Sequence, residues 1–162
     1  MDKVVPALIM LGVVVLVFTG LALGWRARRR RQIALPAPGA PTPDLGAPIL
    51  VDDGFYVATT FAGAPTDRVA VRGLAFRSRA IVSIVPEGLV LGLAGQPEVF
   101  IPRETVRGVG RATWTIDRVV GRDGLVFVRW ALGDREVDTY LRSRDPDALA
   151  TALQTLESKE AA

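Results

Sequence analysis

The chain has 162 residues, of which 49% are hydrophobic, and its 20 Lys and Arg against 17 Asp and Glu give a formal net charge of +3. It contains no Cys and no His, which excludes disulfides, thiolate nucleophiles, His-ligated zinc and catalytic triads with a histidine base. The chain from Ile33 onward carries 14 basic and 16 acidic side chains, so the whole excess of positive charge lies before Ile33. Because the larger part of the chain is slightly acidic, we do not expect it to bind DNA or RNA.

An uncharged stretch of 22 residues runs from Val4 to Trp25. With a rise of ~1.5 Å per residue, a helix of this length crosses the ~30 Å hydrocarbon core of a bilayer. We therefore predict a single transmembrane helix over 4–25, preceded by a short extracytoplasmic N-terminus, 1–3. Trp25 ends the span, where an amphipathic ring prefers the headgroup layer.

A juxtamembrane cluster of arginines, 26–32, follows the predicted span. Its five basic side chains are Arg26, Arg28, Arg29, Arg30 and Arg31. Only Lys3 is basic before the span, so the positive-inside rule places the N-terminus outside and the rest of the chain on the cytoplasmic side of the plasma membrane. We expect the cluster and Trp25 to contact anionic lipid. The alternative is a cleaved signal peptide ending near Ala22-Leu23-Gly24, although arginines directly after that site oppose translocation.

The segment 33–48 is rich in proline and alanine. Its prolines are Pro36, Pro38, Pro41, Pro43 and Pro48. Proline at this spacing favours extended polyproline II backbone and blocks helix and sheet. We therefore predict a spacer that reaches on the order of 50 Å at ~3.1 Å per residue. A PxxP ligand motif at Pro38–Pro41 is the alternative interpretation.

The remaining domain, 49–157, consists of short β-type runs separated by turn residues. The predicted strands are 55–61, 68–74, 78–85, 89–93, 98–101, 108–120, 125–132 and 135–142. Turns are predicted at 63–67, 86–88, 94–97, 121–124 and 133–134, and a helical turn or irregular corner at 102–106. These runs predict a mainly-β domain of about seven antiparallel strands, curled into a barrel or orthogonal sandwich.

The chain ends in a predicted amphipathic helix. Asp145 suits the N-cap and Pro146 the first helical position. An apolar stripe follows at helical spacing: Leu149, Ala152, Leu153 and Leu156. We expect this stripe to cap an open end of the barrel, and the polar tail, 158–162, to be disordered.

Three stretches carry a resemblance to a known family: Tyr56–Ala80, Phe100–Asp134 and Asp138–Arg142. With the N-terminal span, they make the chain resemble the membrane-anchored pleckstrin-homology-like (PH-like) proteins of actinobacteria. The resemblance implies a PH-like antiparallel barrel with a C-terminal helix. It implies no defined function, because the family is largely uncharacterised. Some members carry a transport label, but one helix cannot line a transport path.

The resemblance also indicates where a ligand would bind. PH domains that bind phosphoinositides use basic residues on the first two strands and the intervening loop. In that region this chain has Arg68, Arg72, Arg77 and Arg79. Guanidinium groups suit phosphate, so these arginines form the candidate ligand patch. The alternative is a solvated strand face, because arginines at alternate strand positions usually face water.

Other candidate sites are weaker. Trp114 and Trp130 are interpreted as core aromatics, with an exposed ligand groove as the alternative. Gly108-Val-Gly110 lacks the third glycine and the βαβ setting of a dinucleotide site. The acidic run at 134–138 does not fit a calcium loop. We therefore name no catalytic, cofactor-binding or metal-ligating residue.

These observations predict a non-enzymatic binding or scaffolding module tethered to the cytoplasmic face of the membrane, without a cofactor. It would recognise a protein partner, for example by β-augmentation at a sheet edge, or an anionic lipid headgroup. One alternative is an accessory subunit of a membrane transporter or another membrane complex. The other is an enzyme that uses carboxylates alone.

Overall fold

The computed structural model describes residues 4–33, 35–69, 74, 76–112, 114–115, 118–119 and 124–157. The predicted N-terminus, 1–3, and tail, 158–162, lie outside the described residues. The chain divides into two compact units, Met1–Ala34 and Leu35–Ala162, and each is described by itself.

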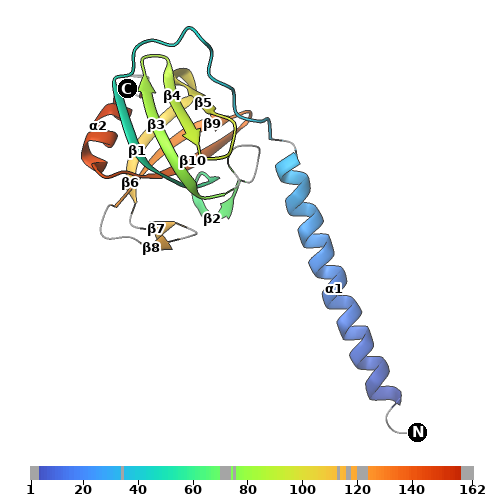
Figure 1. Cartoon of the computed structure of the whole chain (residues 1–162). Coiled ribbons are helices and arrows are strands. Elements are labelled where there is room, and N and C mark those ends of the chain that lie inside the picture. The colour runs from blue at the N-terminus through green and yellow to red at the C-terminus, as the bar shows by residue number, and fades with distance from the viewer. Residues whose placement is uncertain are drawn as a thin grey trace. The chain divides into compact units, whose positions relative to one another are not determined.

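The first unit contains one continuous helix, α1 (Val4–Ile33), of 30 residues (Figure 1). Its part from Val4 to Gly24 has a mean hydropathy of 2.7, and none of it is buried. By length and composition this part could cross a bilayer, as a membrane anchor or as a signal sequence. The backbone continues as helix through the arginine cluster to Ile33.

In the described part of the second unit, eight antiparallel strands form one sheet in the order β5-β4-β3-β1-β10-β9-β6, with β2 attached to β1. The strands are β1 (Leu50–Phe61), β2 (Ala64–Arg68), β3 (Ser78–Val85), β4 (Gly88–Leu93), β5 (Val99–Pro102), β6 (Val106–Ala112), β9 (Leu125–Leu132) and β10 (Arg135–Arg142). A short 3-10 helix, η1 (Arg103–Thr105), precedes β6. Two further short strands, β7 (Trp114–Thr115) and β8 (Arg118–Val119), pair only with each other.

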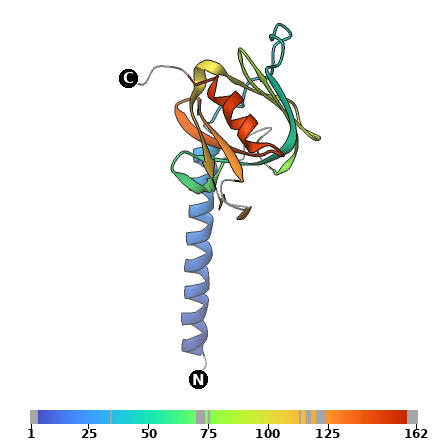
Figure 2. The same cartoon turned by 90° about the vertical axis from the view of Figure 1, so that its left-hand side faces the viewer.

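Strand β1 joins the two halves of the sheet. Its first half pairs with β3 and its second half with β10, and Phe55 is in register with both Arg79 and Arg142. The register with β10 shifts between Tyr56 and Ala58, and such a bulge bends a strand. The β3–β4–β5 meander and the β10–β9–β6 meander are therefore continuous through β1, and the sheet curls around a core (Figure 2).

The core is filled by branched aliphatic side chains from the inner face of the sheet and closed by helix α2 (Pro146–Gln154), which crosses the opening of the curled sheet (Figure 2). The leucines of the predicted stripe, Leu149, Leu153 and Leu156, are fully buried. The Asp145 carboxylate accepts a hydrogen bond from the backbone N–H of Ala148 at 2.9 Å, as expected of an N-cap. The predicted capping helix is thus confirmed.

Tryptophan positions were predicted as core. Trp130 is 2% exposed and donates its indole N–H to the hydroxyl of Thr139 at 2.9 Å, which confirms the prediction for this residue. The side chain of Trp114 lies outside the described residues.

Two predictions in the first half of the domain are wrong. The first strand begins at Leu50 rather than at residue 55, and Asp52 and Asp53 are paired with β3. The prediction missed these residues because aspartate is a poor strand former. The turn predicted over 63–67 is shorter and lies at 62–63, and strand β2 follows it directly; of the strand predicted over 68–74, Arg68 ends β2, and 70–73 lie outside the described residues. Leu74 is not in a strand; it is buried, and its carbonyl oxygen accepts a hydrogen bond from the Tyr56 hydroxyl.

The later strand predictions fare better. Strands β3, β4, β5, β9 and β10 lie where they were predicted, and the helical turn expected over 102–106 is η1. The long strand predicted over 108–120 is instead β6 followed by the separate β7–β8 pair. Most of the turn predicted at 121–124 lies outside the described residues.

The segment 35–48, here called the strap, is packed on the domain. Leu35 is only 8% exposed and belongs to the core. The carbonyl oxygen of Gly39 accepts a hydrogen bond from the Phe100 N–H at 2.8 Å, and the Gly46 N–H donates to the Glu87 carboxylate at 3.0 Å. The prediction of a free spacer is therefore wrong for these residues, because long-range contacts hold the extended proline-rich backbone along β5 and the β3–β4 turn.

Truncating Leu35 tests whether the strap belongs to the folded domain. We expect Leu35→Ala to lower the free energy of unfolding by about 2 kcal/mol, because leucine burial is lost and a cavity remains. Denaturant unfolding of the full-length chain in detergent micelles, followed by tryptophan fluorescence, measures the change. Thr42→Ala, at an exposed strap position, is the control and should change stability by less than about 0.5 kcal/mol. Negligible effects of both substitutions would show that the strap is a free linker.

Candidate anion-binding site

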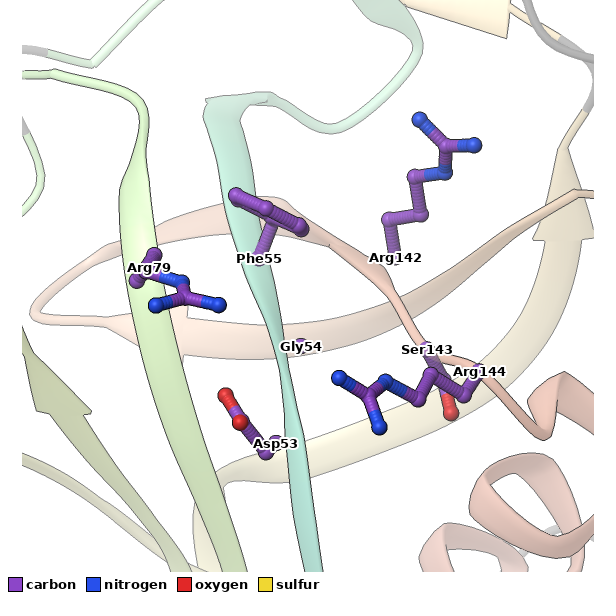
Figure 3. A pocket seen from close by; sticks show the side chains of 7 residues that line it. All are labelled: Asp53, Gly54, Phe55, Arg79, Arg142, Ser143 and Arg144. Atoms are coloured by element: carbon purple, nitrogen blue, oxygen red, sulfur yellow. The ribbon is translucent and has the colours of Figure 1, made fainter.

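A pocket of about 440 Å³ opens where β3, β1 and β10 lie side by side (Figure 3). Its lining residues are Asp53, Gly54, Phe55, Arg79, Arg142, Ser143 and Arg144. Three of them are arginines, and Asp53 is the one acidic side chain among them. The pocket is therefore electropositive, although the sequence of the domain carries an acidic excess.

Strand pairing brings two of the arginines together. Phe55 is paired with Arg79 on β3 and with Arg142 on β10, and directly paired residues point to the same face of a sheet. Their neighbours Tyr56 and Leu141 are buried in the core. Phe55, Arg79 and Arg142 therefore point to the outer face.

Gly54 permits the close approach of β10 and the chain that follows it. A Cβ atom at this position would lie 2.4 Å from the carbonyl oxygen of Arg142, so a larger residue would displace one of the two strands. The hydroxyl of Ser143 accepts a hydrogen bond from the Asp145 N–H at 2.9 Å, which fixes the turn between β10 and α2. This turn presents Arg144 to the pocket.

Two of the pocket arginines extend toward Gly54 (Figure 3). Arg79 and Arg144 extend toward it from opposite sides, and Asp53 lies between them (Figure 3). Arg142 points away from Gly54, beyond Phe55 (Figure 3). Arg79 and Arg144 are thus placed to contact one ligand, with Arg142 at the rim.

Two other arginines of the domain, Arg129 and Arg111, are held by carboxylates. Arg129 forms two hydrogen bonds with Asp138, from Nε at 2.7 Å and from Nη2 at 3.0 Å, and this contact raises the pKa of Arg129. Arg111 is ion-paired with Asp147.

The pocket arginines differ from these. Within the described part of the chain, no ion pair or side-chain hydrogen bond occupies Arg79, Arg142 or Arg144. Their guanidinium N–H groups remain available, and a guanidinium binds phosphate or carboxylate through two parallel hydrogen bonds. The chemistry of the pocket is therefore the binding of an anion.

The predicted ligand patch is only partly brought together. Arg79 lies in the pocket, and the guanidinium of Arg77 borders it, 5.3 Å from the centre of the Phe55 ring. Arg68 is half-buried and donates to the carbonyl oxygen of Val57 at 3.2 Å. Arg72 lies outside the described residues, as do the side chains of Trp25 and of the arginines in 28–31, whose lipid contact stays a prediction.

Sequence reasoning missed Arg142 and Arg144, which come from the far end of the chain. One signal could have found them. The tripeptide Arg-Ser-Arg occurs at 77–79, where β3 begins, and again at 142–144, where β10 ends, and both strands pair with β1. The repeat becomes informative only once the pairing of the strands is known.

A model of the family described as bacterial PH domain-like matches residues 34–157. The chain belongs to this family. A search of curated proteins found no match. Domains of the PH-like kind are typically non-enzymatic binding modules, and the predicted PH-like fold is confirmed. The matched region begins at residue 34, which agrees with the packing of the strap on the domain. Actinobacterial origin and membrane anchoring stay predictions.

Beside the pocket, a second small cluster covers part of the outer face of the PH-like domain. Val57, Leu125 and Tyr140 are buried there, and the rings of Phe127 and Tyr140 are 5.7 Å apart. Burial raises the pKa of the Tyr140 phenol above 10.0, and the negative charge of Asp138 adds to this effect. The neutral phenol is therefore favoured in the folded domain.

This shift makes stability depend on alkaline pH. A group whose pKa is raised by folding contributes stability that is fully present below its unfolded pKa, near 10.0, and is lost as the pH rises through its folded pKa. We expect the free energy of unfolding to fall between about pH 9 and about pH 11 more steeply in the wild type than in Tyr140→Phe. Denaturant unfolding of both full-length chains at the two pH values measures the slopes. Equal slopes would contradict the burial of this phenol.

Proposed function

We propose that the protein is a non-enzymatic binding module that α1 tethers to the cytoplasmic face of the plasma membrane and whose PH-like domain recognises an anionic group. The observation that carries the proposal is the pocket in which Arg79, Arg142 and Arg144 have no partner among the described residues. The anionic group belongs to a lipid headgroup or to an acidic protein partner.

The apolar part of α1 and the arginines after it support the tether. The apolar run is long enough to span, and the arginines mark the cytoplasmic side. Because the strap is packed on the domain, only about ten residues remain between Gly24 and Leu35, and α1 continues through them to Ile33, so this connection is ~15 Å long at ~1.5 Å per residue. Such a tether keeps the domain near the bilayer and raises its concentration against other membrane-bound ligands to roughly millimolar.

Electrostatics support an anionic ligand. Arg79 and Arg144 extend toward one point, so their positive charges repel each other, and a bound anion lowers this repulsion (Figure 3). Asp53 offsets only part of the positive charge of the three lining arginines. A ligand with two or more negative charges should therefore bind more tightly than a monoanion, and salt should weaken binding because the site is open to solvent.

Membrane insertion and orientation can be tested together. We expect the full-length chain to stay in the membrane pellet after alkaline carbonate extraction, because an uncharged span does not leave the lipid. Protease should digest the PH-like domain in inverted vesicles and leave it intact in spheroplasts. Release by carbonate would contradict the anchor and favour a cleaved signal sequence. Digestion in intact spheroplasts would contradict the cytoplasmic orientation.

Anion binding can be tested with inorganic pyrophosphate as a soluble probe. Calorimetric titration of the full-length chain in nanodiscs of neutral lipid should give a dissociation constant that Arg79→Gln and Arg144→Gln each raise roughly tenfold. Asp53→Asn should lower it, because a repulsive charge is removed. Arg103→Gln, at an exposed position outside the pocket, is the control and should leave it unchanged. Equal weakening by the control and the pocket variants would reject the site.

A further inference from the structure

The strap is attached to the domain at few points. Leu35 is its only buried residue, and a Cβ atom at Gly133, in the turn between β9 and β10, would lie 2.9 Å from Cδ of Pro36. In the part of the chain that the structure describes, two hydrogen bonds, at Gly39 and Gly46, join the strap to the rest of the domain. A segment held by so few contacts opens at a lower free energy than the sheet that it covers.

The strap crosses the outer edge of β5, the last strand of the sheet. Among the described residues it pairs with β5 at one position, where the Phe100 N–H donates to the carbonyl oxygen of Gly39 at 2.8 Å. Residues two apart face the same edge, so Ala37 and Pro41 would be the next strap residues to pair. Pro41 has no N–H to donate. The strap therefore covers the edge without adding a regular strand to it.

The edge of β5 offers more pairing than the strap uses. Phe100 faces outward, and by the same alternation so does Glu98, just before the strand begins. An added strand without proline would pair with Phe100 and continue past Glu98, and each further ladder bond would favour it over the strap. Pro102 limits pairing at the other end of β5, because it has no N–H. An extended segment of a partner protein is thus able to displace the strap by β-augmentation.

The chemistry of this edge selects the partner. Removal of Leu35 leaves an apolar space in the core, which an aliphatic side chain would refill. Glu87 and Glu98 border β5 against one arginine, Arg103, so basic side chains are favoured over acidic ones. The strap of a second copy carries the same prolines and would gain no bond over the strap already in place. The edge therefore fits an extended, proline-free segment in which aliphatic and basic residues alternate.

Release of the strap also changes the length of the tether. Leu35 is the second residue after the end of α1 at Ile33, so no free spacer lies between this helix and the docked strap. A released strap, 35–48, would add about 40 Å at ~3.1 Å per residue of polyproline II backbone. The segment that the sequence marks as a spacer would then act as one.

We propose that the strap is a latch on the edge of β5. When docked, it keeps the tether of the PH-like domain short. When the extended segment of a partner protein displaces it, the strap becomes a spacer and the domain reaches further from the end of α1. The two events are coupled, because strap and partner compete for the Phe100 N–H. The change in reach rests on the proposed anchoring by α1, whereas the competition at β5 does not.

Labelling of single cysteines tests whether the strap is released while the domain stays folded, since the chain has no native cysteine. In the full-length chain in nanodiscs of neutral lipid, Leu35→Cys should react with a maleimide roughly a hundredfold faster than Leu91→Cys, which is fully buried in β4. It should react roughly tenfold more slowly than Thr42→Cys, at an exposed strap position. Cooperative unfolding of each variant, followed by tryptophan fluorescence, shows that its domain is folded.

Displacement is tested with two synthetic peptides. The probe Lys-Val-Thr-Val-Lys-Val should raise the labelling rate of Leu35→Cys roughly tenfold at saturation and leave that of Leu91→Cys unchanged. A matched peptide with proline in place of threonine should have little effect, because proline removes a ladder bond. In the double variant Gly39→Cys, Phe100→Cys, a disulfide fixes the strap on β5 and should abolish peptide binding until it is reduced.

The change in tether length is measured by energy transfer. A donor on Thr151→Cys, exposed on α2, transfers to acceptor lipids in the nanodisc. Adding Leu35→Asp places a charge where the core holds a leucine, so it should release the strap and lower the transfer roughly twofold. Thr42→Asp, at an exposed strap position, is the matched control and should leave the transfer unchanged.

Two labelling results would overturn the latch. Equal rates at Leu35→Cys and Leu91→Cys would show that the strap leaves only when the whole domain unfolds. Equal effects of the two peptides at Leu35→Cys, or no effect of either, would show that the edge does not accept an added strand.

Two further results would contradict other parts of the proposal. A disulfide that joins two copies of the double variant, rather than closing within one, would make the occupant of β5 a second copy instead of a partner protein. Unchanged energy transfer in Leu35→Asp, in a chain that resists carbonate extraction, would show that the tether does not lengthen. Release of the chain by carbonate would instead reject the proposed anchor and leave the labelling results standing.

Discussion

The double pairing of β1, with β3 on one edge and β10 on the other, is the constraint on which the rest of the structure depends. It joins two meanders into one curled sheet around the core. It also places side chains from distant parts of the sequence in one row, because Phe55 is in register with Arg79 and Arg142 at once. Gly54 makes this double pairing possible, because the carbonyl oxygen of Arg142 occupies the space that a side chain at position 54 would fill.

The charges of the domain follow from the same arrangement. Arg129 and Asp138 face each other on neighbouring strands and form a hydrogen-bonded ion pair, so their charges neutralise each other on that part of the outer face. Where β3, β1 and β10 lie side by side, Arg79 and Arg144 extend toward the backbone at Gly54 (Figure 3). The single negative charge of Asp53 does not balance their positive charges. An unbalanced cluster of guanidinium groups gives this PH-like domain a surface suited to an anionic ligand.

Local signals in the sequence were sufficient for much of the fold. The alternation of β10 and the capping of α2 by Asp145 depend on neighbouring residues, and both were predicted. The strap was not, since Leu35 is buried by contacts that proline content cannot reveal. The site was predicted only through Arg79, because bringing Arg142 beside it requires the β1–β10 pairing, which is a property of the topology.

The most direct test of the central claim observes the guanidinium groups themselves. NMR of the arginine Nε–H signals of the full-length chain in neutral nanodiscs, assigned by single Arg→Lys variants, reports which arginines contact pyrophosphate. The account predicts that the signals of Arg79 and Arg144 shift together and saturate, while that of Arg129, held by Asp138, stays in place. Unchanged signals from Arg79 and Arg144, or equal shifts at Arg129, would contradict it.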